Sequence, residues 1–425
     1  MNMNSSNICF DLNTYLLNFV FNKSHSLSLF QNKEDNTKTE YIKINGNNVA
    51  KYINEFWTSK QRMANSLHEV SYRACFKSQL PRFFIQLLTG KSDIVYDPFS
   101  GRGTTVIEAA LLGRNIIAND VNPLSTIISK PRILIPTFAQ IEKRIQQINF
   151  KEDLKADIDL SMFFHPKTES EIVSLKGYLE NRKKKCQEDN IDLWIRMIAT
   201  NRLTGHSKNF FSVYTLPPNQ AVSQERQKKI NLKLNQKPQH KNVKKIILIK
   251  SADLLKDLDS KKVAFMHNIG RRSLFLNHDA RNTPEIKNST VSLTVTSPPF
   301  LDVVRYDQDN WLRCWFNNID AKNIAKKITM SKNVHQWSLV MADVFKELYR
   351  ITKDEGWVAF EVGEIRNKKI KLEEIVLPLG MRAGFKAQGV MINEQAFTKT
   401  SNIWGVENNK RGTNSNRIVI FQKCS

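Results

Sequence analysis

A glycine-rich turn between an apolar strand and a helix constrains the fold of this chain more than any other feature. An apolar strand is expected at 93–96, and the turn follows it as Asp97-Pro-Phe-Ser-Gly-Arg-Gly-Thr-Thr105. A helix is expected from Val106 to Leu112, and a second apolar strand at 115–118 ends in Asn119-Asp120. Strand, glycine turn, helix and strand in this order predict a βαβ unit with parallel strands.

The turn favours a nucleoside ligand over a nucleoside triphosphate or a dinucleotide. It has no Lys, which a P-loop needs, and Val106 stands where a dinucleotide fingerprint has its third glycine. Asp97 would repel a pyrophosphate but can accept a hydrogen bond from an ammonium group, and S-adenosylmethionine (AdoMet) carries one. Asp120, at the end of the second strand, can accept from both ribose hydroxyls. An ordinary turn without a ligand is the alternative.

The rest of the chain alternates between α/β patterns and a basic, mostly helical stretch. Further strands are expected at 273–276 (running to Asp279), 291–296, 356–362 and 417–422, with helical patterns at 52–88 and 335–351. The stretch 225–250 has nine Lys or Arg against one Glu. The expected organisation is an N-terminal extension at 1–50, accessory or loosely held, a first α/β half at 51–150, an insertion at 151–275, and a second half at 276–425.

Composition sets the class of partner and the compartment. The chain has 425 residues with 64 Lys and Arg against 41 Asp and Glu, a formal charge of +23, which favours a polyanion such as nucleic acid. The alternative is coding bias, since Lys, Asn and Ile are all abundant. The five cysteines form no CxxC pair and no apolar run reaches 18 residues, so we expect a cytoplasmic protein without a disulfide framework, a metal site or a membrane span.

A second motif, Ser297-Pro-Pro-Phe300, follows the apolar strand at 291–296. The carboxyl ends of strands are where ligands bind in α/β sheets. Two prolines fix the backbone and remove two N–H donors, so that the neighbouring carbonyls are rigid acceptors. A serine hydroxyl and a carbonyl can hold an exocyclic amine, and Phe300 can stack on its base. In isolation, a strand that simply ends at two prolines explains the motif as well.

Together, these motifs resemble those of amino-group DNA methyltransferases that use AdoMet. The resemblance rests on the ordered motifs Phe99-x-Gly101-x-Gly103, Asp120 and Thr296-Ser-Pro-Pro-Phe300, and it extends over roughly 50–425. Longer sequence segments also resemble those of the family, at 72–77, 165–167, 202–206, 214–218 and 309–313. The resemblance implies a Rossmann-like AdoMet-dependent methyltransferase sheet with helices on both faces, interrupted by the basic insertion, which would supply much of the target-recognition surface.

The resemblance also implies roles for individual residues. The cofactor set is Asp97, Phe99, Gly101, Gly103, Thr104, Asp120, Asp279, Tyr72 and Lys77. The catalytic set is Ser297, Pro298, Pro299 and Phe300. The candidate DNA contacts are Arg202, His206, Tyr214, Lys228, Lys229, Lys244 and Lys245. In one departure from the family pattern, the acid for the adenine ring of the cofactor, Asp279, lies beyond the insertion, which therefore falls between the second and third strands.

Ser297 in first position resembles the cytosine-N4 members of the family, whereas adenine-N6 members mostly have Asp or Asn there. Cytosine-C5 methylation is disfavoured because it needs a thiolate, usually in a Pro-Cys pair, and no Cys here follows a Pro. The expected function is site-specific N4 methylation of cytosine in duplex DNA by base flipping and direct attack. Its setting would be restriction–modification, with a cognate restriction endonuclease as partner. Alternatives are an adenine-N6 enzyme, an RNA methyltransferase and a non-catalytic nucleic-acid binding protein.

Overall fold

The chain forms two compact units in the computed structural model. Unit 1 comprises Met1–Arg62, Lys287–Pro298 and Ser338–Ser425, and unit 2 comprises Met63–Ile286 and Pro299–Trp337. The structure describes residues 11–20, 36–44, 46–57, 64–73, 75–217, 220–299, 306–328, 333–362, 364–365, 370–394 and 415–424. Both units mix helices with strands, so the expected α/β class is confirmed.

Unit 2 contains the predicted βαβ arrangement. β3 (Ile94–Asp97) and β4 (Asn115–Asn119) are parallel, and α3 (Thr104–Leu111) connects them. β5 (Leu274–Leu276) is parallel to β4 on its other side, so a long segment of the chain separates two neighbouring strands. α3 packs against both β3 and β4 and buries most of its side chains, and the chain leaves it at Gly113, whose φ of +80° suits glycine.

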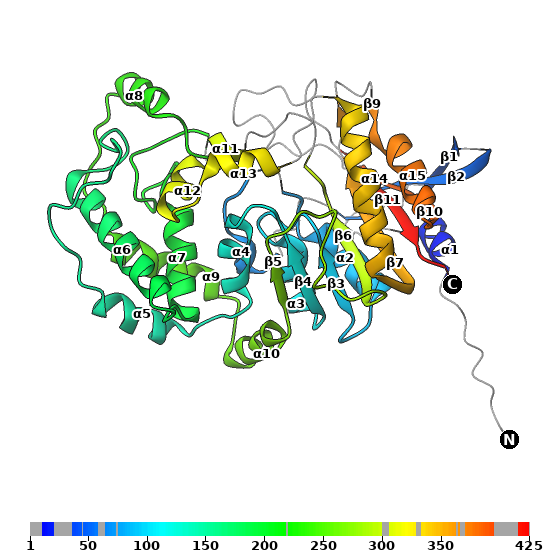
Figure 1. Ribbon diagram of the computed structural model, residues 1–425, viewed down its shortest axis with the longest axis horizontal. Helices are drawn as coiled ribbons and strands as arrows, with labels where there is room; N and C mark the ends of the chain where they lie inside the picture. Colours follow the sequence, from blue (N-terminus) through cyan, green and yellow to red (C-terminus); the bar gives the residue numbers. More distant parts are fainter. Residues whose placement is uncertain are drawn as a thin grey trace, which may run out of the picture. The chain divides into compact units, whose positions relative to one another are not determined.

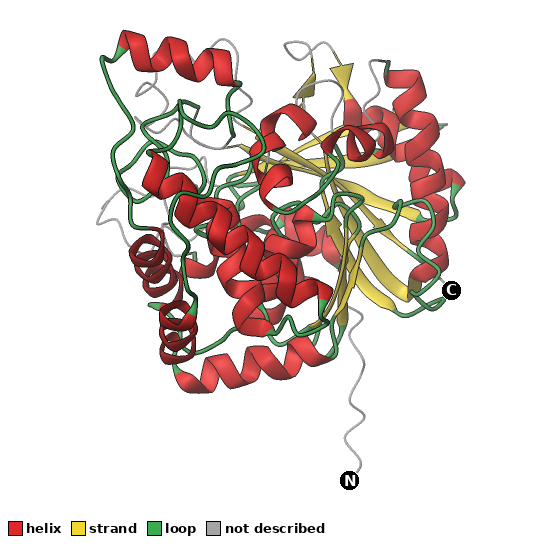
Figure 2. Cartoon of the chain, turned by 60° about the vertical axis from the view of Figure 1, so that its left-hand side comes forward, coloured by secondary structure: helices red, strands yellow, loops and turns green. Residues whose placement is uncertain are grey.

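The segment between β4 and β5 is helical, as expected. α9 (Val243–Leu255) packs against α5 (Phe138–Gln147), α6 (Pro166–Lys184) and α7 (Asn190–Arg202), and long loops join these helices (Figures 1 and 2). The other helices of unit 2 are η1 (Ser66–His68), α2 (Gln79–Leu88), α4 (Leu124–Ser129), η2 (Lys130–Arg132), α8 (Gln224–Lys233), α10 (Ser260–Arg271), α11 (Tyr306–Asp309), α12 (Trp311–Phe316) and α13 (Ala321–Lys327).

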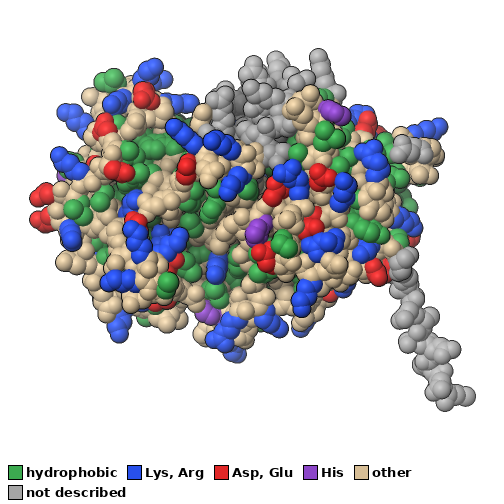
Figure 3. All heavy atoms as spheres, viewed as in Figure 1, with side chains coloured by type: hydrophobic (Ala, Val, Ile, Leu, Met, Phe, Trp, Pro, Cys, Tyr) green, Lys and Arg blue, Asp and Glu red, His purple; other side chains and the backbone are tan. Residues whose placement is uncertain are grey.

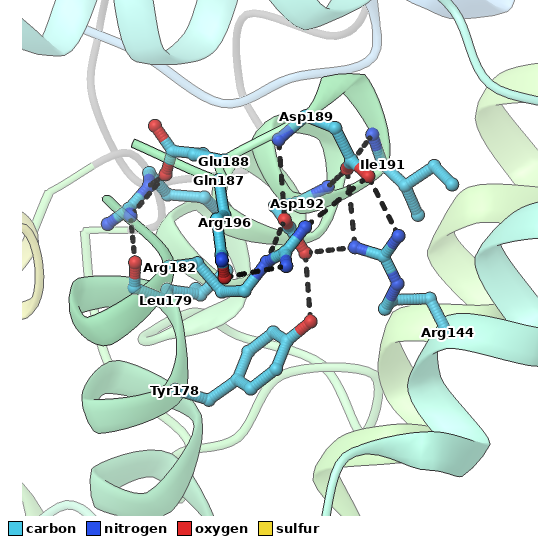
Figure 4. A network of polar contacts seen from close by, with 10 residues as sticks. All are labelled: Arg144, Tyr178, Leu179, Arg182, Gln187, Glu188, Asp189, Ile191, Asp192 and Arg196. Carbon is cyan, nitrogen blue, oxygen red and sulfur yellow. Dashed lines mark hydrogen bonds and ion pairs between the residues drawn. The ribbon is translucent and has the colours of Figure 1, made fainter. Parts of the chain in front are cut away.

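Charged side chains join α5, α6 and α7 in one network (Figure 4). Asp192 is fully buried and accepts hydrogen bonds from Arg144 at 2.6 Å, Arg182 at 2.9 Å and Tyr178 at 3.1 Å. Asp189 caps α7 and pairs with Arg144 at 2.7 Å. A buried carboxylate is tolerated when such donors replace its water, so this network fixes the three helices relative to one another.

Unit 1 is built around strands in the order β1-β2-β10-β11-β7-β6. These are β1 (Lys38–Ile44), β2 (Asn47–Asn54), β10 (Lys386–Glu394), β11 (Ser415–Gln422), β7 (Thr352–Val362) and β6 (Val291–Thr296). β10 is parallel to β2 and β6 to β7, and the other neighbours are antiparallel. A short pair, β8 (Glu364–Ile365) and β9 (Ile370–Lys371), stands apart from them.

Aromatic packing forms the core of unit 1. Phe345 of α14 (Val334–Ile351) contacts Phe360 of β7 with ring centroids 4.9 Å apart, and Phe421 of β11 at 5.3 Å. Phe385, before β10, closes the cluster against Phe345 and Phe421. α15 (Leu372–Arg382) packs on β10 and β11, and α1 (Leu12–Leu17) contacts β10. The apolar residues of the predicted 335–351 helix therefore face this cluster.

The N-terminal region differs from expectation. Residues 38–54 form the hairpin β1–β2 rather than a loosely held extension, and Tyr52 lies in a strand rather than at the start of a helix. Beyond β2, the Asn393 side chain of β10 accepts hydrogen bonds from the backbone N–H groups of Phe56 and Trp57 at 2.7 and 3.1 Å. The partner strand β10 was not expected either, and a strand whose partner lies more than 330 residues away has no local signal.

Candidate functional site

The two glycines of the turn in unit 2 serve different purposes. Both have positive φ, +50° at Gly101 and +79° at Gly103. A Cβ on Gly103 would lie 2.6 Å from the Cβ of Ser129, so this glycine allows α3 to start close against the end of α4. A Cβ on Gly101 would meet nothing nearer than Tyr72, at 3.8 Å. Gly101 therefore leaves its side of the turn open to a ligand.

Asp120 braces the same turn. One carboxylate oxygen accepts the Gly101 N–H at 2.8 Å, and the other accepts the Asn122 N–H at 2.9 Å. Burial raises the pKa of Asp120 to about 6, although both backbone hydrogen bonds lower it. Each oxygen retains acceptor capacity beyond these bonds. The side chain is thus fixed at the carboxyl end of β4 in a position to accept from further donors.

Asn119, which the sequence reading did not single out, ties three strand ends together. Its side-chain amide donates to the carbonyls of Pro98 and His278 at 3.2 and 3.0 Å, and its side-chain oxygen accepts the His278 N–H at 2.9 Å. Pro98 follows β3 and His278 follows β5, and Asn119 itself is 1% exposed. A polar residue before Asp120 at the end of a buried strand was the available signal.

The other predicted cofactor residues of unit 2 gather near the turn to different degrees. Asp97 is buried and accepts from the Phe99 N–H at 3.1 Å, and Thr104, also buried, begins α3. Tyr72 is buried near Gly101, while Lys77 is exposed. Arg102 donates to the carbonyls of Val70 and Phe76 and so ties both residues to the turn.

Asp279 lies beside the end of β4 through the contacts of its neighbour His278 with Asn119. Its carboxylate pairs with Arg281 at 2.6 Å, and this hydrogen bond lowers the pKa of Asp279. The side chain is 41% exposed. Its carboxylate is therefore engaged within its own loop, in contrast to the oxygens of Asp120, which accept only backbone N–H groups in this part of the chain.

Ser297 of unit 1 has a buried acid behind it. Thr296 of β6 is in register with Phe360 of β7, which places Glu361 next to Ser297, and the two side chains are hydrogen-bonded. Asn416 of β11 donates its amide to Glu361 at 2.7 Å. Glu361 is 9% exposed, and burial raises its pKa while the bonds from Asn416 and Ser297 oppose the shift. Neither Glu361 nor Asn416 was predicted, because sheet pairing alone brings them to Ser297.

The rest of the predicted catalytic tetrapeptide is partly described. Pro298 is buried and Pro299 half-buried, and Phe300 lies outside the described residues. Within unit 2, the Pro299 carbonyl accepts the indole N–H of Trp337 at 3.1 Å. Trp337 is fully buried and lies in the first turn of α14 (Val334–Ile351). This tryptophan, also missed from the sequence, therefore fixes the backbone just after Ser297-Pro298.

The predicted DNA contacts do not form one cluster. Arg202 is 7% exposed, its guanidinium stacks 3.9 Å from the centre of the Phe210 ring, and burial lowers its pKa to about 10. His206 is exposed, whereas the Tyr214 carbonyl accepts hydrogen bonds from Gln227 and Gln236. The four lysines fall on two helices: Lys228 and Lys229 are exposed on α8, and on α9 Lys245 is exposed while Lys244 donates to the Ile148 carbonyl at 2.7 Å.

No described helix is both long and apolar enough to span a membrane. Among these residues, no three or more His, Cys, Asp or Glu side chains come together in a way that could hold a metal ion.

Known proteins are similar to this chain in the region that contains the glycine turn. The family model described as DNA methylase, of the N6/N4 type, matches residues 9–130, which include the glycine turn and Asp120. Over 70% of its own length, the chain is 25% identical to the type II methyltransferase M.MvaI of Kocuria varians. Over 61% of its own length, it is 23% identical to the type II methyltransferase M.BsoBI of Geobacillus stearothermophilus. These matches cover 65% and 54% of the relatives, so the chain spans less than two thirds of their length.

Among solved structures, a SAM-dependent methyltransferase from Methanosarcina mazei matches 80% of this chain and 97% of its own, with 11% identity and a TM-score of 0.33. The sequence matches agree with one another, since the family model is described as a DNA methylase and both relatives as type II methyltransferases. Residues 9–130 therefore match the N6/N4 amino-group DNA methylase family, and over a longer stretch the chain is similar to distant type II methyltransferases.

Proposed function

We propose that this chain is an AdoMet-dependent DNA methyltransferase that methylates the exocyclic N4 amine of cytosine. The observation that carries the proposal is the buried acid behind Ser297. A serine that merely ends a strand before two prolines needs no buried carboxylate beside it, and Glu361 is costly to bury unless it has a task. The family match and the type II relatives support DNA as the substrate.

The residues of the glycine turn fit AdoMet. The donor set needed is a carboxylate for the ribose hydroxyls, an acceptor for the amino group and an open backbone, and the turn offers Asp120, Asp97 and Gly101. No lysine or arginine of the turn itself is free for a pyrophosphate, because Arg102 is bound to backbone carbonyls. When bound, AdoMet supplies an electrophilic methyl group on its sulfonium.

Ser297 and Glu361 together suit the handling of an amine. If the serine hydroxyl donates to Glu361, its lone pairs are left to accept an N–H of the target base, and the Pro298 carbonyl can accept the other. Once the nitrogen has gained its methyl group, its N–H proton can pass to the Ser297 oxygen as the serine proton passes to Glu361. Glu361 then becomes neutral, the form that burial favours.

Cytosine N4 is favoured over adenine N6 by the serine itself. The first residue of the tetrapeptide has no charge of its own here, and its acid stands one side chain further away, on β7. A target base must leave the duplex to reach such a site, at a cost of about a few kcal/mol that stacking and edge hydrogen bonds offset. Restriction–modification, with a cognate endonuclease reading the same site, is the setting that the type II relatives support.

Digestion of DNA from a methylation-deficient host that expresses the protein, followed by mass spectrometry, tests the proposal. N4-methylcytosine is the expected product. N6-methyladenine would overturn the choice of base and keep the amino-group mechanism, and C5-methylcytosine would overturn the mechanism. Methylated RNA with unmodified DNA would identify an RNA enzyme. Absence of any modified base, together with no AdoMet binding in calorimetry, would leave a nucleic-acid binding protein.

A further inference from the structure

Polar side chains rather than apolar ones seat α8 in unit 2. Gln227 is the buried residue of this helix, and its amide donates to the Tyr214 carbonyl at 3.0 Å and to Asn231 at 2.8 Å. Asn231 donates to the Met162 carbonyl at 2.8 Å, and Gln236, just after the helix, donates to Tyr214 at 2.9 Å. Hydrogen bonds are directional, so these contacts fix both the position and the rotation of α8.

The outward face of α8 is basic with one exposed leucine. At 100° per residue, Lys229 lies at the centre of this face, with Arg226 and Lys233 on one side and Leu232 and the exposed Glu225 on the other. Leu232 is 82% exposed, more than any other large apolar side chain in the described part of the chain. Lys and Arg side chains gather over α8, which stands at the edge of the unit (Figures 1 and 3).

Exposure of this kind has no benefit for folding. A leucine that stays in water gives up about 1.5–3 kcal/mol of burial, and a polar-seated helix gains no core to compensate. α8 has four cations against the single carboxylate of Glu225. A pocket of about 440 Å³, lined in part by Arg226 and Trp311, opens beside the first turn of the helix.

We propose, on the basis of the proposed DNA substrate, that α8 enters a groove of duplex DNA. The major groove admits an α-helix. Arg226, Lys229 and Lys233 then contact phosphates on the groove walls, and Leu232 lies against base edges, where the thymine C5-methyl is the apolar group available. The partner is a polyanion because the helix face is basic, and a duplex because a single leucine is too small for a protein interface. Gln227 and Asn231 act as positioning residues.

The salt dependence of DNA binding distinguishes phosphate contacts made by α8 from a general attraction of the basic protein to DNA. The probe is a fluorescein-labelled random-sequence duplex, and anisotropy gives the affinity at several salt concentrations. R226Q/K229Q/K233Q should reduce the log–log slope by about 0.9 for each lost phosphate contact. The matched control is K261Q/K262Q/R271Q on α10 of the same unit, which removes the same charge from exposed positions and should change the slope little. Equal changes in the two variants would overturn the proposal.

Leu232→Ala tests the base contact independently, and as an exposed position it leaves folding intact. Affinity should fall about tenfold while the salt slope stays the same. Replacement of thymine by uracil in the probe should weaken wild-type binding and leave the variant unaffected; a variant that binds like wild type would contradict the leucine contact.

Methyl transfer by the wild-type protein is measured separately. If the α8 variants lose DNA binding but the wild-type protein methylates no DNA, the proposed enzymatic function is wrong and the proposed binding of α8 in a DNA groove is supported. If the wild-type protein methylates DNA and the α8 variants have the same salt dependence of DNA binding as wild type, only the proposal that α8 enters a DNA groove is wrong.

Discussion

Asp120 has two roles that act on its charge in opposite ways. It braces the glycine turn through the Gly101 N–H, which favours the carboxylate, and its burial raises the pKa to about 6, which favours the acid. A ligand that donates hydrogen bonds to the carboxylate would decide between the two forms. Both the identity of this residue and the pH at which it is studied therefore bear on the proposed cofactor site.

Asp120→Asn removes the charge but keeps an oxygen for the Gly101 N–H. We expect AdoMet affinity to fall by about 1.5–3 kcal/mol, the range for hydrogen bonds to charged groups, while DNA binding is retained. Isothermal calorimetry with AdoMet measures the change. Glu361→Gln, in the other unit, is the control and should bind AdoMet normally; equal affinity in wild type and Asp120→Asn would remove Asp120 from the cofactor set.

The raised pKa of Asp120 also predicts proton release on binding. In the free protein the carboxyl holds a proton below about pH 6, and ribose hydroxyls favour the charged form, so AdoMet affinity should fall as the pH drops below that value. The effect of Asp120 on folding stability has the opposite sign. Its pKa is raised from 3.8 to about 6 in the folded protein, so the folded state holds the proton more tightly than the unfolded chain. The resulting contribution to the free energy of unfolding is fully present below pH 3.8 and is lost as the pH rises through about 6. Calorimetry in buffers of different ionisation enthalpy measures the proton, and Asp120→Asn should show none.

Glu361 is expected to act on turnover rather than on cofactor binding. Glu361→Gln keeps the shape and the hydrogen bond but cannot take a proton from Ser297, so kcat should fall by about a hundredfold, the lower end for general acid–base groups. In wild type, kcat should decrease as the pH is lowered through the raised pKa of Glu361, and the variant should lose that limb. Glu355→Gln, an exposed acid on the same strand, is the matched control. If Glu361→Gln has the same kcat as wild type, the role of Glu361 is purely structural.

At the scale of elements, the network between α5, α6 and α7 makes the helical part of unit 2 sensitive to single charges. Arg144→Ala would leave the buried Asp192 with Arg182, Tyr178 and the backbone N–H of Asp189 as its donors. Breaking an isolated buried pair costs about 3–5 kcal/mol, and because Arg182 remains we expect about 2 kcal/mol less stability. Urea unfolding followed by circular dichroism measures it. Lys184→Ala breaks an exposed pair with Glu180 and should cost less than about 1 kcal/mol; equal losses would contradict the importance of burial.

Local sequence patterns predict the elements around the glycine turn well. β3, β4 and β6 lie within one residue of their expected bounds, because buried apolar runs between Gly, Pro and Asp have few alternatives. β1, β2 and β10 were not predicted. β2 exposes or half-exposes most of its residues and gains its place by pairing Lys51 with Val390, which no local window contains.

The candidate site shows the same division. Asp120 and Ser297 could be singled out because each directly follows an apolar strand, where α/β proteins place their ligands. Glu361, Asn416 and Trp337 could not, since they reach the motif through strand register and a side-chain contact with a carbonyl. Arg202 looked like a surface cation in sequence, and only its stacking on Phe210 reveals that it is buried.

At the scale of the whole molecule, unit 1 depends on segments from both ends of the chain. Removal of residues 386–425 deletes β10 and β11, so the amides of β2 should exchange with solvent much faster than in the full chain. β3, β4 and β5 pair among themselves within unit 2 and should stay protected. Hydrogen exchange with mass spectrometry tests this, and protected β2 amides in the truncated protein would contradict it.

The pairing of β2 with β10 also sets an order of events during synthesis. The hairpin β1–β2 is translated before unit 2 and β10 after it, so the β2 edge must wait unpaired while unit 2 is made. An open strand edge invites pairing with other nascent chains. Lys51 on β2 and Glu40 on β1, paired at 2.6 Å, keep that waiting hairpin polar, which is one way for a long-lived translation intermediate to avoid aggregation.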